Sequence, residues 1–261
     1  MNKILAIFAL LLCSCTTAFA QAQAMGPTQP SFPDMSFYNS QMASDRVRGA
    51  MSRYENDWKK LFAEKKLDWP AKNIYIRCFK ADQKFEVYAR NKATDTFTHV
   101  KTFAVCVLSG KMGPKRREND KQVPEGYYFF DEFNKNSNYY LSLLVSYPNF
   151  SDLIKGDKEA PGSAIYVHGS CVTIGCLPMT DEIIQEIYAL CVVARTNGQL
   201  NIPIHIFPTY FTRQGLTYLS QWYRENDNQK FWTSLKKGYD YFQSYKKILP
   251  VMYDGEGNYV Y

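Results

Sequence analysis

Residues 166–181 bring together side chains that could carry out acyl transfer. One of the three histidines of the chain, His168, precedes Cys176 by eight positions. A cysteine attacks a carbonyl carbon as its thiolate, and a nearby imidazole can accept the thiol proton. Gly175 directly before the cysteine permits a tight turn that presents backbone N–H groups to an oxyanion. We therefore predict Cys176 as a nucleophile and His168 as its base. The alternative is a strand that ends in a cysteine-bearing loop without chemistry.

The order of these residues resembles the active-site motif of the L,D-transpeptidase (YkuD-type) catalytic domain family. That motif is a His-Gly pair, a variable gap and then Ser/Thr-x-Gly-Cys. Here the corresponding residues are His168-Gly169 and Thr173-Ile174-Gly175-Cys176. The short gap is similar to the YafK-like branch of the family. Residues 121–128 also resemble a strand opening of the family and residues 202–208 the strand that follows its motif helix, so the resemblance covers residues 73–210.

The resemblance implies a mainly β fold with flanking helices, built around a β-sandwich or barrel-like catalytic domain. It implies that Cys176 attacks a carbonyl in a peptidoglycan stem peptide beside diaminopimelic acid, and that His168 serves as the base. The Gly169 carbonyl would orient the imidazole, and the N–H groups of Gly175 and Cys176 would hold the oxyanion. Thr173 would brace the loop by hydrogen bonding. No cofactor is implied.

Two positions depart from the pattern of many relatives, which have a His and an Arg where this chain has Ile174 and Pro178. An Arg can hold a peptide carboxylate in a bidentate fork, and a proline cannot. The departure favours hydrolysis of a diaminopimelate-linked amide, as in the release of a wall-attached lipoprotein. An L,D-transpeptidase that forms cross-links or attaches proteins to peptidoglycan is the main alternative. An inactive cell-wall-binding module is the third.

The first twenty residues have the features of an export signal. Lys3 precedes an apolar run over residues 4–12, and Ala18-Phe19-Ala20 forms a small-x-small cleavage site. The run is shorter than the roughly 20 residues that span a bilayer, so we predict no transmembrane helix. We expect a periplasmic or cell-envelope protein. Lipid anchoring at Cys15 is the alternative to cleavage after Ala20.

Removal of residues 1–20 leaves five cysteines, and an odd number leaves at least one thiol free in an oxidising compartment. That suits a reduced Cys176. We expect Cys78 and Cys106 to be buried in strands rather than bridged, and Cys171 to have a structural role rather than to pair with Cys176. The spacing of cysteines and histidines gives no four-ligand zinc pattern, so no metal is predicted.

The whole chain carries a net charge of +6. Its basic cluster at residues 111–117 is flanked by Glu118 and Asp120 and is expected to be a solvated loop. No basic stripe with interleaved aromatics indicates a nucleic-acid partner.

Periodicity and turn residues predict the elements that position the motif. After a flexible leader (21–41), an N-terminal helical segment is expected over 42–72 and a C-terminal helical extension over 211–261. Within the catalytic segment 73–210 we expect strands over 74–79, 85–89, 96–108, 127–130 and 139–147. A short strand (164–167) should deliver His168, a helix should begin at the Thr180 cap, and a last strand should cover 202–207. His205 on that last strand is expected to be a buried structural residue.

Overall fold

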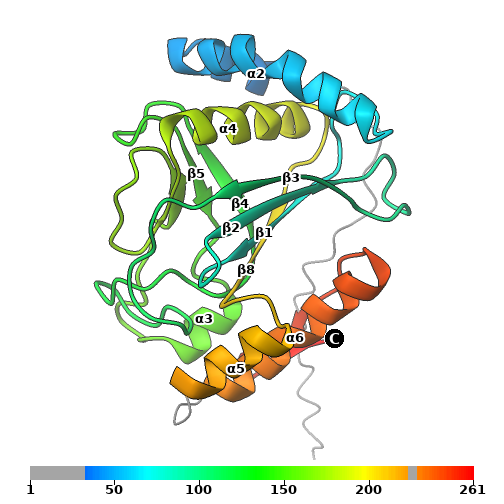
Figure 1. The fold of residues 1–261 in the computed structure, drawn as a ribbon. Coiled ribbons are helices and arrows are strands. Elements are labelled where there is room, and N and C mark those ends of the chain that lie inside the picture. The colour runs from blue at the N-terminus through cyan, green and yellow to red at the C-terminus, as the bar shows by residue number, and fades with distance from the viewer. Residues whose placement is uncertain (1–32, 223–227) are drawn as a thin grey trace, which may run out of the picture.

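The computed structural model describes residues 33–222 and 228–261 (Figure 1). The predicted signal segment and most of the predicted leader lie outside the described residues. The end of that leader is not loose, because Met35–Met42 form helix α1. The Asp34 carboxylate caps this helix at the Phe37 N–H (2.9 Å), and Gln41 is buried against the hydroxyl of Tyr188 (2.7 Å).

Eight strands form one half-barrel sheet in the order β3-β2-β1-β8-β4-β5-β6-β7, which confirms the predicted fold class. The strands are β1 (Ile74–Phe79), β2 (Lys84–Ala89), β3 (Thr98–Ala104), β4 (Gly126–Asn134), β5 (Ser142–Val145), β6 (Tyr166–His168), β7 (Leu177–Pro178) and β8 (Ile202–Phe207). Two neighbouring pairs, β1–β8 and β6–β7, are parallel, and the others are antiparallel. The central strands β1 and β8 are buried along their whole length, as a sheet covered on both faces requires.

The two edges of this sheet meet at a seam. The Cys106 N–H, two residues after β3, donates to the Pro178 carbonyl of β7 (3.0 Å). A disulfide joins Cys106 to Cys171, which lies between β6 and β7. The prediction that Cys106 is a buried strand thiol was therefore wrong. Strand β3 ends at Ala104, and the curvature of the sheet brings the following residues to the opposite edge.

Two helices cover one face of the sheet, with α2 (Asp45–Glu64) lying on α4 (Asp181–Thr196) at the top of Figure 1. Five residues of α2 at spacings of one, three, four and seven positions are buried: Val47, Ala50, Met51, Trp58 and Phe62. The Trp58 indole N–H donates to the Glu186 carbonyl (2.9 Å) and so links the two helices. Helix α2 is shorter than the helical segment predicted over 42–72. The backbone is extended at Ser44, before the helix begins, and Lys66 has a φ of +58° just after the helix ends.

The opposite end of the sheet carries the C-terminal segment. Helices α5 (Arg213–Trp222) and α6 (Asn228–Tyr245) form within the expected C-terminal helical extension over 211–261. Helix α3 (Phe150–Lys155) and the small pair β9 (Met252–Tyr253) and β10 (Tyr259–Val260) were not foreseen. Arg77 of β1 is buried here, with its guanidinium carbon 4.7 Å from the ring centre of Tyr239 and 4.9 Å from that of Phe242. Within the described ranges, no helix is both long and apolar enough to cross a membrane.

A buried ion pair ties the end of β1 to the long loop 109–125. The side chains of Lys80 and Glu125 have no exposed surface, and their charged atoms are 2.9 Å apart. Lys80 Nζ also donates to three backbone carbonyls of the loop, those of Lys111, Gly113 and Val123. Glu125 accepts the Gly113 N–H and the Trp232 indole N–H of α6, each at 2.7 Å. Every charged atom of the pair is thus satisfied.

Replacing Lys80 with Met should destabilise the fold strongly, because Glu125 would remain buried without a counter-charge. We expect a loss of about 3–5 kcal/mol in the free energy of unfolding, measured by urea denaturation. Lys84→Met, at an exposed position of β2, is the control and should change stability little. A Lys80→Met loss as small as that of the control would show that the pair is energetically neutral.

Candidate active site

Strands β6 and β7 place His168 and Cys176 together. The two strands are parallel, with Val167 opposite Leu177 and His168 opposite Pro178. Side chains directly opposite each other in a sheet share a face, and every second residue along a strand returns to it. Cys176 directly precedes β7 and, by the same alternation, lies on the face of His168. The structure brings the predicted nucleophile and base to one surface.

The thiol of Cys176 is partly buried and bonded to backbone groups. Its Sγ accepts the Tyr166 N–H (3.5 Å) and donates to the Ala164 carbonyl (3.7 Å). Among the described residues, no hydrogen bond joins the thiol to His168. Burial raises the pKa of Cys176 above its ordinary 9.0, while the Tyr166 N–H and the charge of Lys115 act to lower the pKa. The thiol is therefore protonated at neutral pH.

His168 is only 2% exposed and is held in one orientation. Its Nδ1 lies 2.6 Å from the Gly169 carbonyl, the contact that the motif resemblance implied. Because a carbonyl oxygen only accepts, Nδ1 must carry the proton, and Nε2 is left as the basic nitrogen. Burial lowers the pKa of His168 below its ordinary 6.5, although the Gly169 hydrogen bond opposes the shift. The imidazole is neutral at neutral pH and ready to accept a proton.

The hydroxyl of Thr173 organises the turn before the nucleophile. It accepts the N–H groups of Gly175 (3.1 Å) and Cys176 (2.7 Å) and donates to the Cys176 carbonyl (2.9 Å). The brace that we expected of Thr173 is present. Both N–H groups assigned to the oxyanion are thus bonded to this hydroxyl, and they can hold an oxyanion only after Thr173 releases them. Gly175 has a φ of +141°, and a Cβ there would lie 3.2 Å from the Gln122 carbonyl.

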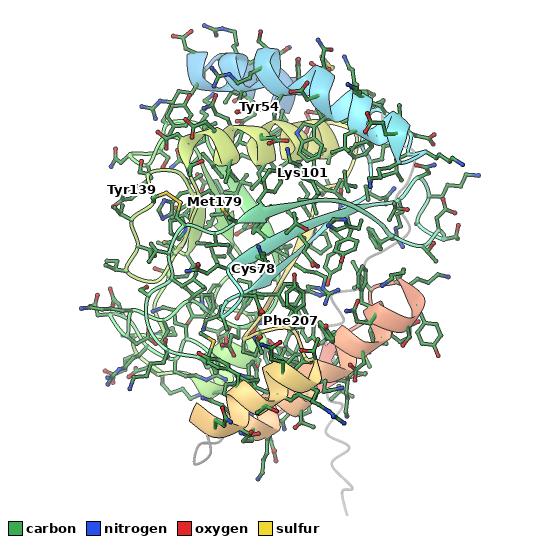
Figure 2. All side chains as sticks on the ribbon, viewed as in Figure 1. Tyr54, Cys78, Lys101, Tyr139, Met179 and Phe207 are labelled. Carbon is green, nitrogen blue, oxygen red and sulfur yellow. A yellow bond between two sulfur atoms is a disulfide. The ribbon has the colours of Figure 1, made fainter. Side chains whose placement is uncertain are left out.

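The loop between the two motif halves is fixed at several points. Asp181, in the first turn of α4, accepts the Ser170 N–H (2.9 Å), and Met179 accepts the Cys171 N–H (3.3 Å). The sequence analysis did not predict this contact of Asp181. It also missed Tyr139, whose ring centre lies 4.7 Å from that of His168. Figure 2 shows Tyr139 and Met179 on the same side of the molecule. Tyr139 covers the imidazole from the β4–β5 connection.

The Cys106–Cys171 disulfide leaves three described thiols, of which Cys78 and Cys191 are buried. Cys176 is the accessible one. Cys171 is therefore structural, as expected, and pairs with a partner that the sequence did not indicate.

The basic cluster at residues 111–117 is not simply a solvated loop, as we had expected. Lys115 is buried, and its Nζ donates to the Asp120 carboxylate (2.6 Å) and to the Arg117 carbonyl (2.8 Å). A Cβ on Gly162 would lie 2.8 Å from Lys115 Cε, so this cation is packed against the segment that precedes β6. Its charge helps to lower the pKa of Cys176. Lys115 therefore adds positive charge near the nucleophile.

The surface beside the nucleophile is apolar. Ile174 is 77% exposed and Val172 is 54% exposed, and both lie in the loop that leads to Cys176. Pro178 is buried. The other two histidines lie elsewhere: the Tyr75 hydroxyl is 2.7 Å from Nδ1 of buried His205, and His99 contacts Thr102 at the surface. Within the described residues, no group of three or more His, Cys, Asp or Glu side chains is arranged to hold a metal ion.

Comparisons with known proteins agree on this segment. The profile of the YkuD family, described as an L,D-transpeptidase catalytic domain, matches residues 73–206. The putative L,D-transpeptidase YafK of Escherichia coli K12 is 31% identical over 176 residues, which cover 67% of this chain and 68% of YafK.

Two solved structures are also similar. The helical cell shape determining protein Pgp2 of Campylobacter jejuni aligns with a TM-score of 0.42 at 18% identity, over 54% of this chain and 49% of Pgp2. Bd1075 of Bdellovibrio bacteriovorus aligns with a TM-score of 0.39 at 22% identity, over 66% of this chain and 60% of Bd1075. The chain thus spans about half the length of Pgp2.

The neutral forms of Cys176 and His168 at neutral pH predict how alkylation and turnover depend on pH. Alkylation of Cys176 by iodoacetamide reports the thiolate, so its rate should rise with pH with a midpoint above 9.0. Attack on a carbonyl needs a neutral His168, so kcat/KM should hold down to pH 6.5 and fall only below it. Cys176→Ala should abolish the alkylation. A thiolate midpoint below 9.0 would instead indicate a preformed thiolate–imidazolium pair.

His205 should matter for stability and not for chemistry. Burial lowers the pKa of His205 from 6.5 to about 3, so its contribution is complete above pH 6.5 and is lost progressively as the pH falls toward 3. Between pH 7.5 and 5 this group should cost about 2 kcal/mol of unfolding free energy. Urea titrations at both pH values give the unfolding free energy of the wild type and of His205→Gln, and the variant should lack this loss. The same loss between pH 7.5 and 5 in both proteins would contradict the prediction. Asp152, whose pKa is raised by burial to about 6, titrates in both proteins and cancels in the comparison.

Proposed function

Because the chain belongs to the L,D-transpeptidase (YkuD) catalytic domain family, we propose that it modifies peptidoglycan stem peptides by acyl transfer through Cys176. The observation that supports the proposal most is the state of His168. Its Nδ1 is committed to the Gly169 carbonyl, which leaves Nε2 as a neutral base on the face of the thiol. A surface with an accessible thiol and a fixed, unprotonated imidazole is what nucleophilic catalysis by cysteine requires.

The reaction begins with both groups neutral. His168 Nε2 takes the thiol proton as Sγ bonds to the carbonyl carbon of the wall peptide, and the carbonyl oxygen becomes an oxyanion. The N–H groups of Gly175 and Cys176 turn from the Thr173 hydroxyl to that oxyanion. The imidazolium then gives its proton to the leaving amine as the C–N bond breaks, which leaves a thioester on Cys176. Water or a second amine resolves the thioester, with His168 again accepting a proton.

We favour water as the final acceptor, and hence hydrolysis of a diaminopimelate-linked amide, as in the release of a wall-linked lipoprotein. Ile174 presents an exposed apolar side chain beside the nucleophile, and buried Pro178 offers no charge to hold the carboxylate of a second stem peptide. The alternative is transpeptidation, the activity in the name of YafK. The predicted export signal supports a location in the periplasm or cell envelope.

The test is to incubate the mature protein with a tetrapeptide-bearing muropeptide, with and without a free amine acceptor, and to follow products and acyl-enzyme by mass spectrometry. Turnover by water alone supports the hydrolase. An acyl-enzyme that persists until the amine arrives and then yields a dimer identifies a transpeptidase. No change to any muropeptide would favour a binding module without activity.

Matched variants assign the roles within the motif. Cys176→Ala should abolish turnover, and His168→Ala should lower kcat/KM by about 10²-fold or more. Cys171→Ser breaks the Cys106–Cys171 disulfide but leaves Cys176 and His168 in place, so it should retain most activity. An inactive Cys171→Ser together with an active Cys176→Ala would overturn the assignment of the nucleophile.

A further inference from the structure

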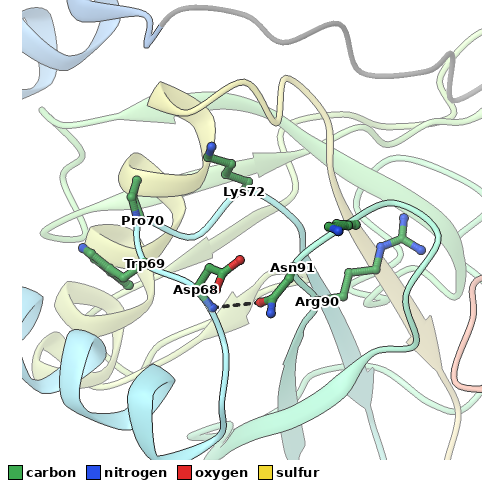
Figure 3. A pocket seen from close by; sticks show the side chains of 7 residues that line it. Asp68, Trp69, Pro70, Lys72, Arg90 and Asn91 are labelled. Atoms are coloured by element: carbon green, nitrogen blue, oxygen red, sulfur yellow. Dashed lines mark hydrogen bonds between the residues drawn. The ribbon is translucent and has the colours of Figure 1, made fainter.

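One surface of the molecule that is open to a substrate is continuous with the nucleophile. The cavity between the α2–β1 and β2–β3 connections, which Figure 3 shows, is not that surface. In Figure 1 the β2–β3 connection and the loop before Cys176 lie on opposite sides of the molecule. A peptide bound at Cys176 instead meets the face of the sheet that carries the thiol.

The strand register places four side chains in a row across that face. Glu132 of β4 pairs with Leu144 of β5, and Leu144 pairs with Tyr166 of β6. The parallel register of β6 and β7 sets Tyr166 beside Cys176, and the Tyr166 N–H donates to the Cys176 Sγ (3.5 Å). Residues that are directly opposite each other in a sheet share a face. We call Glu132, Leu144, Tyr166 and Cys176 the nucleophile row.

Solvent reaches the nucleophile row, whereas the other face of the same strands is core. Glu132 is exposed, and the other three residues of the row are partly exposed. The next residues along β5, β6 and β7 alternate to the core face and are buried there: Leu143, Val167 and Leu177. Because neighbouring strands lie about 4.8 Å apart, the row runs for about 14 Å between the Cα atoms of Cys176 and Glu132. An extended substrate group can lie along it.

The end of the row away from the thiol is negatively charged. No ion pair among the described residues includes Glu132. After burial, its charge is the next cause that raises the pKa of Tyr166, and it also contributes to the raised pKa of Tyr188 on the α4 side, after burial and Cys191. Asp131, the unpaired residue of the bulge in β4, is exposed next to it. This end of the row therefore favours a cation.

The middle of the row suits a methylene chain. Leu144 is apolar, and Tyr166 offers an aromatic ring. Amine side chains lay their stems along such surfaces and keep the charged head in water. A four-carbon amine side chain spans about 7 Å from the attacked carbonyl carbon to its nitrogen, by ordinary bond lengths. The bond to Sγ, a hydrogen bond and the glutamate side chain add about as much again, which matches the length of the row.

We propose that Glu132 is a specificity-determining residue that binds the terminal ammonium on the side chain of the residue whose carbonyl Cys176 attacks. The methylene stem of that side chain lies over Tyr166 and Leu144, and the ammonium donates a charge-assisted hydrogen bond to the carboxylate. The inference rests on the proposed function, under which the attacked residue is diaminopimelate, whose side chain ends in an amine-bearing carbon.

The test uses three tetrapeptides that differ only in the third residue, which is diaminopimelate, lysine or norleucine. Lysine keeps the terminal amine of diaminopimelate without its carboxylate, and norleucine has neither group. Binding to the mature protein in the Cys176→Ala form is measured by calorimetry. The diaminopimelate and lysine peptides should bind about fivefold more tightly than the norleucine peptide, or better.

Substitutions at an exposed position assign that preference to one carboxylate without a risk to folding. Glu132→Gln should remove the preference for lysine over norleucine. Glu132→Lys should reverse it, because like charges repel. Glu64→Gln, a matched change at an exposed position of α2, is the control and should keep the preference of the parent protein.

Three results would overturn the proposal: no binding of any of the peptides, equal binding of the lysine and norleucine peptides, or a preference that both Glu132 variants retain. Turnover of the same peptides by the protein with Cys176 intact tests the proposed function separately. A preference without turnover would disprove the wall chemistry and leave the ammonium site in place. Turnover without a preference would disprove the assignment of Glu132 alone.

Discussion

The buried Lys80–Glu125 ion pair is the constraint on which the rest of the structure depends. A lysine and a glutamate without solvent contact are tolerated only when each charged atom has partners. Besides each other, Lys80 and Glu125 bind backbone groups of the 109–125 loop and the Trp232 indole of α6. The pair therefore fixes a long loop that has no regular structure of its own. The same loop brings the Gln122 carbonyl against the Gly175 turn and carries buried Lys115. Through this loop, the geometry of the nucleophile depends on a charge pair in a different part of the chain.

The candidate active site lies where the curved sheet closes on itself. Edge strands expose unpaired backbone groups, and here the Cys106 N–H and the Cys106–Cys171 disulfide join the β3 edge to the β7 edge. The His168-to-Cys176 loop lies at this seam and is further held by Asp181 and Met179. A loop fixed in this way can present a thiol at a surface while strained conformations persist, such as the positive φ values of Ser170 and Cys171. The disulfide also consumes the other thiols that could compete with Cys176 at this surface.

The electrostatics of the site favour a neutral resting state. Burial acts on both groups in the direction of the uncharged form, raising the pKa of Cys176 and lowering that of His168. Proton transfer is then coupled to the attack on the carbonyl instead of preceding it, and an unreactive thiol is protected from oxidation while it waits for substrate. The Tyr166 N–H and the charge of Lys115 lower the pKa of Cys176 and so partly oppose the effect of burial. The exposed side chain of Ile174 adds an apolar surface beside the thiol.

The sequence alone predicted the candidate catalytic residues and determined the order of the main elements, because both depend on local information. The His168-Gly169 and Thr173-to-Cys176 motif, the periods of β1, β2, α4 and β8, and the Thr180 cap can each be recognised within a few residues. Tertiary structure decided what depends on residues far apart in the chain. Cys106 and Cys171 are 65 positions apart, and only the closing of the sheet edges makes them a pair. Lys115 was expected at the surface and is buried because Asp120 and the Gly162 segment enclose it. Tyr139 and Asp181 reach the catalytic loop only because β5 pairs with β6 and α4 begins beside it. No local pattern encodes those distances, since they follow from the register and curvature of the whole sheet.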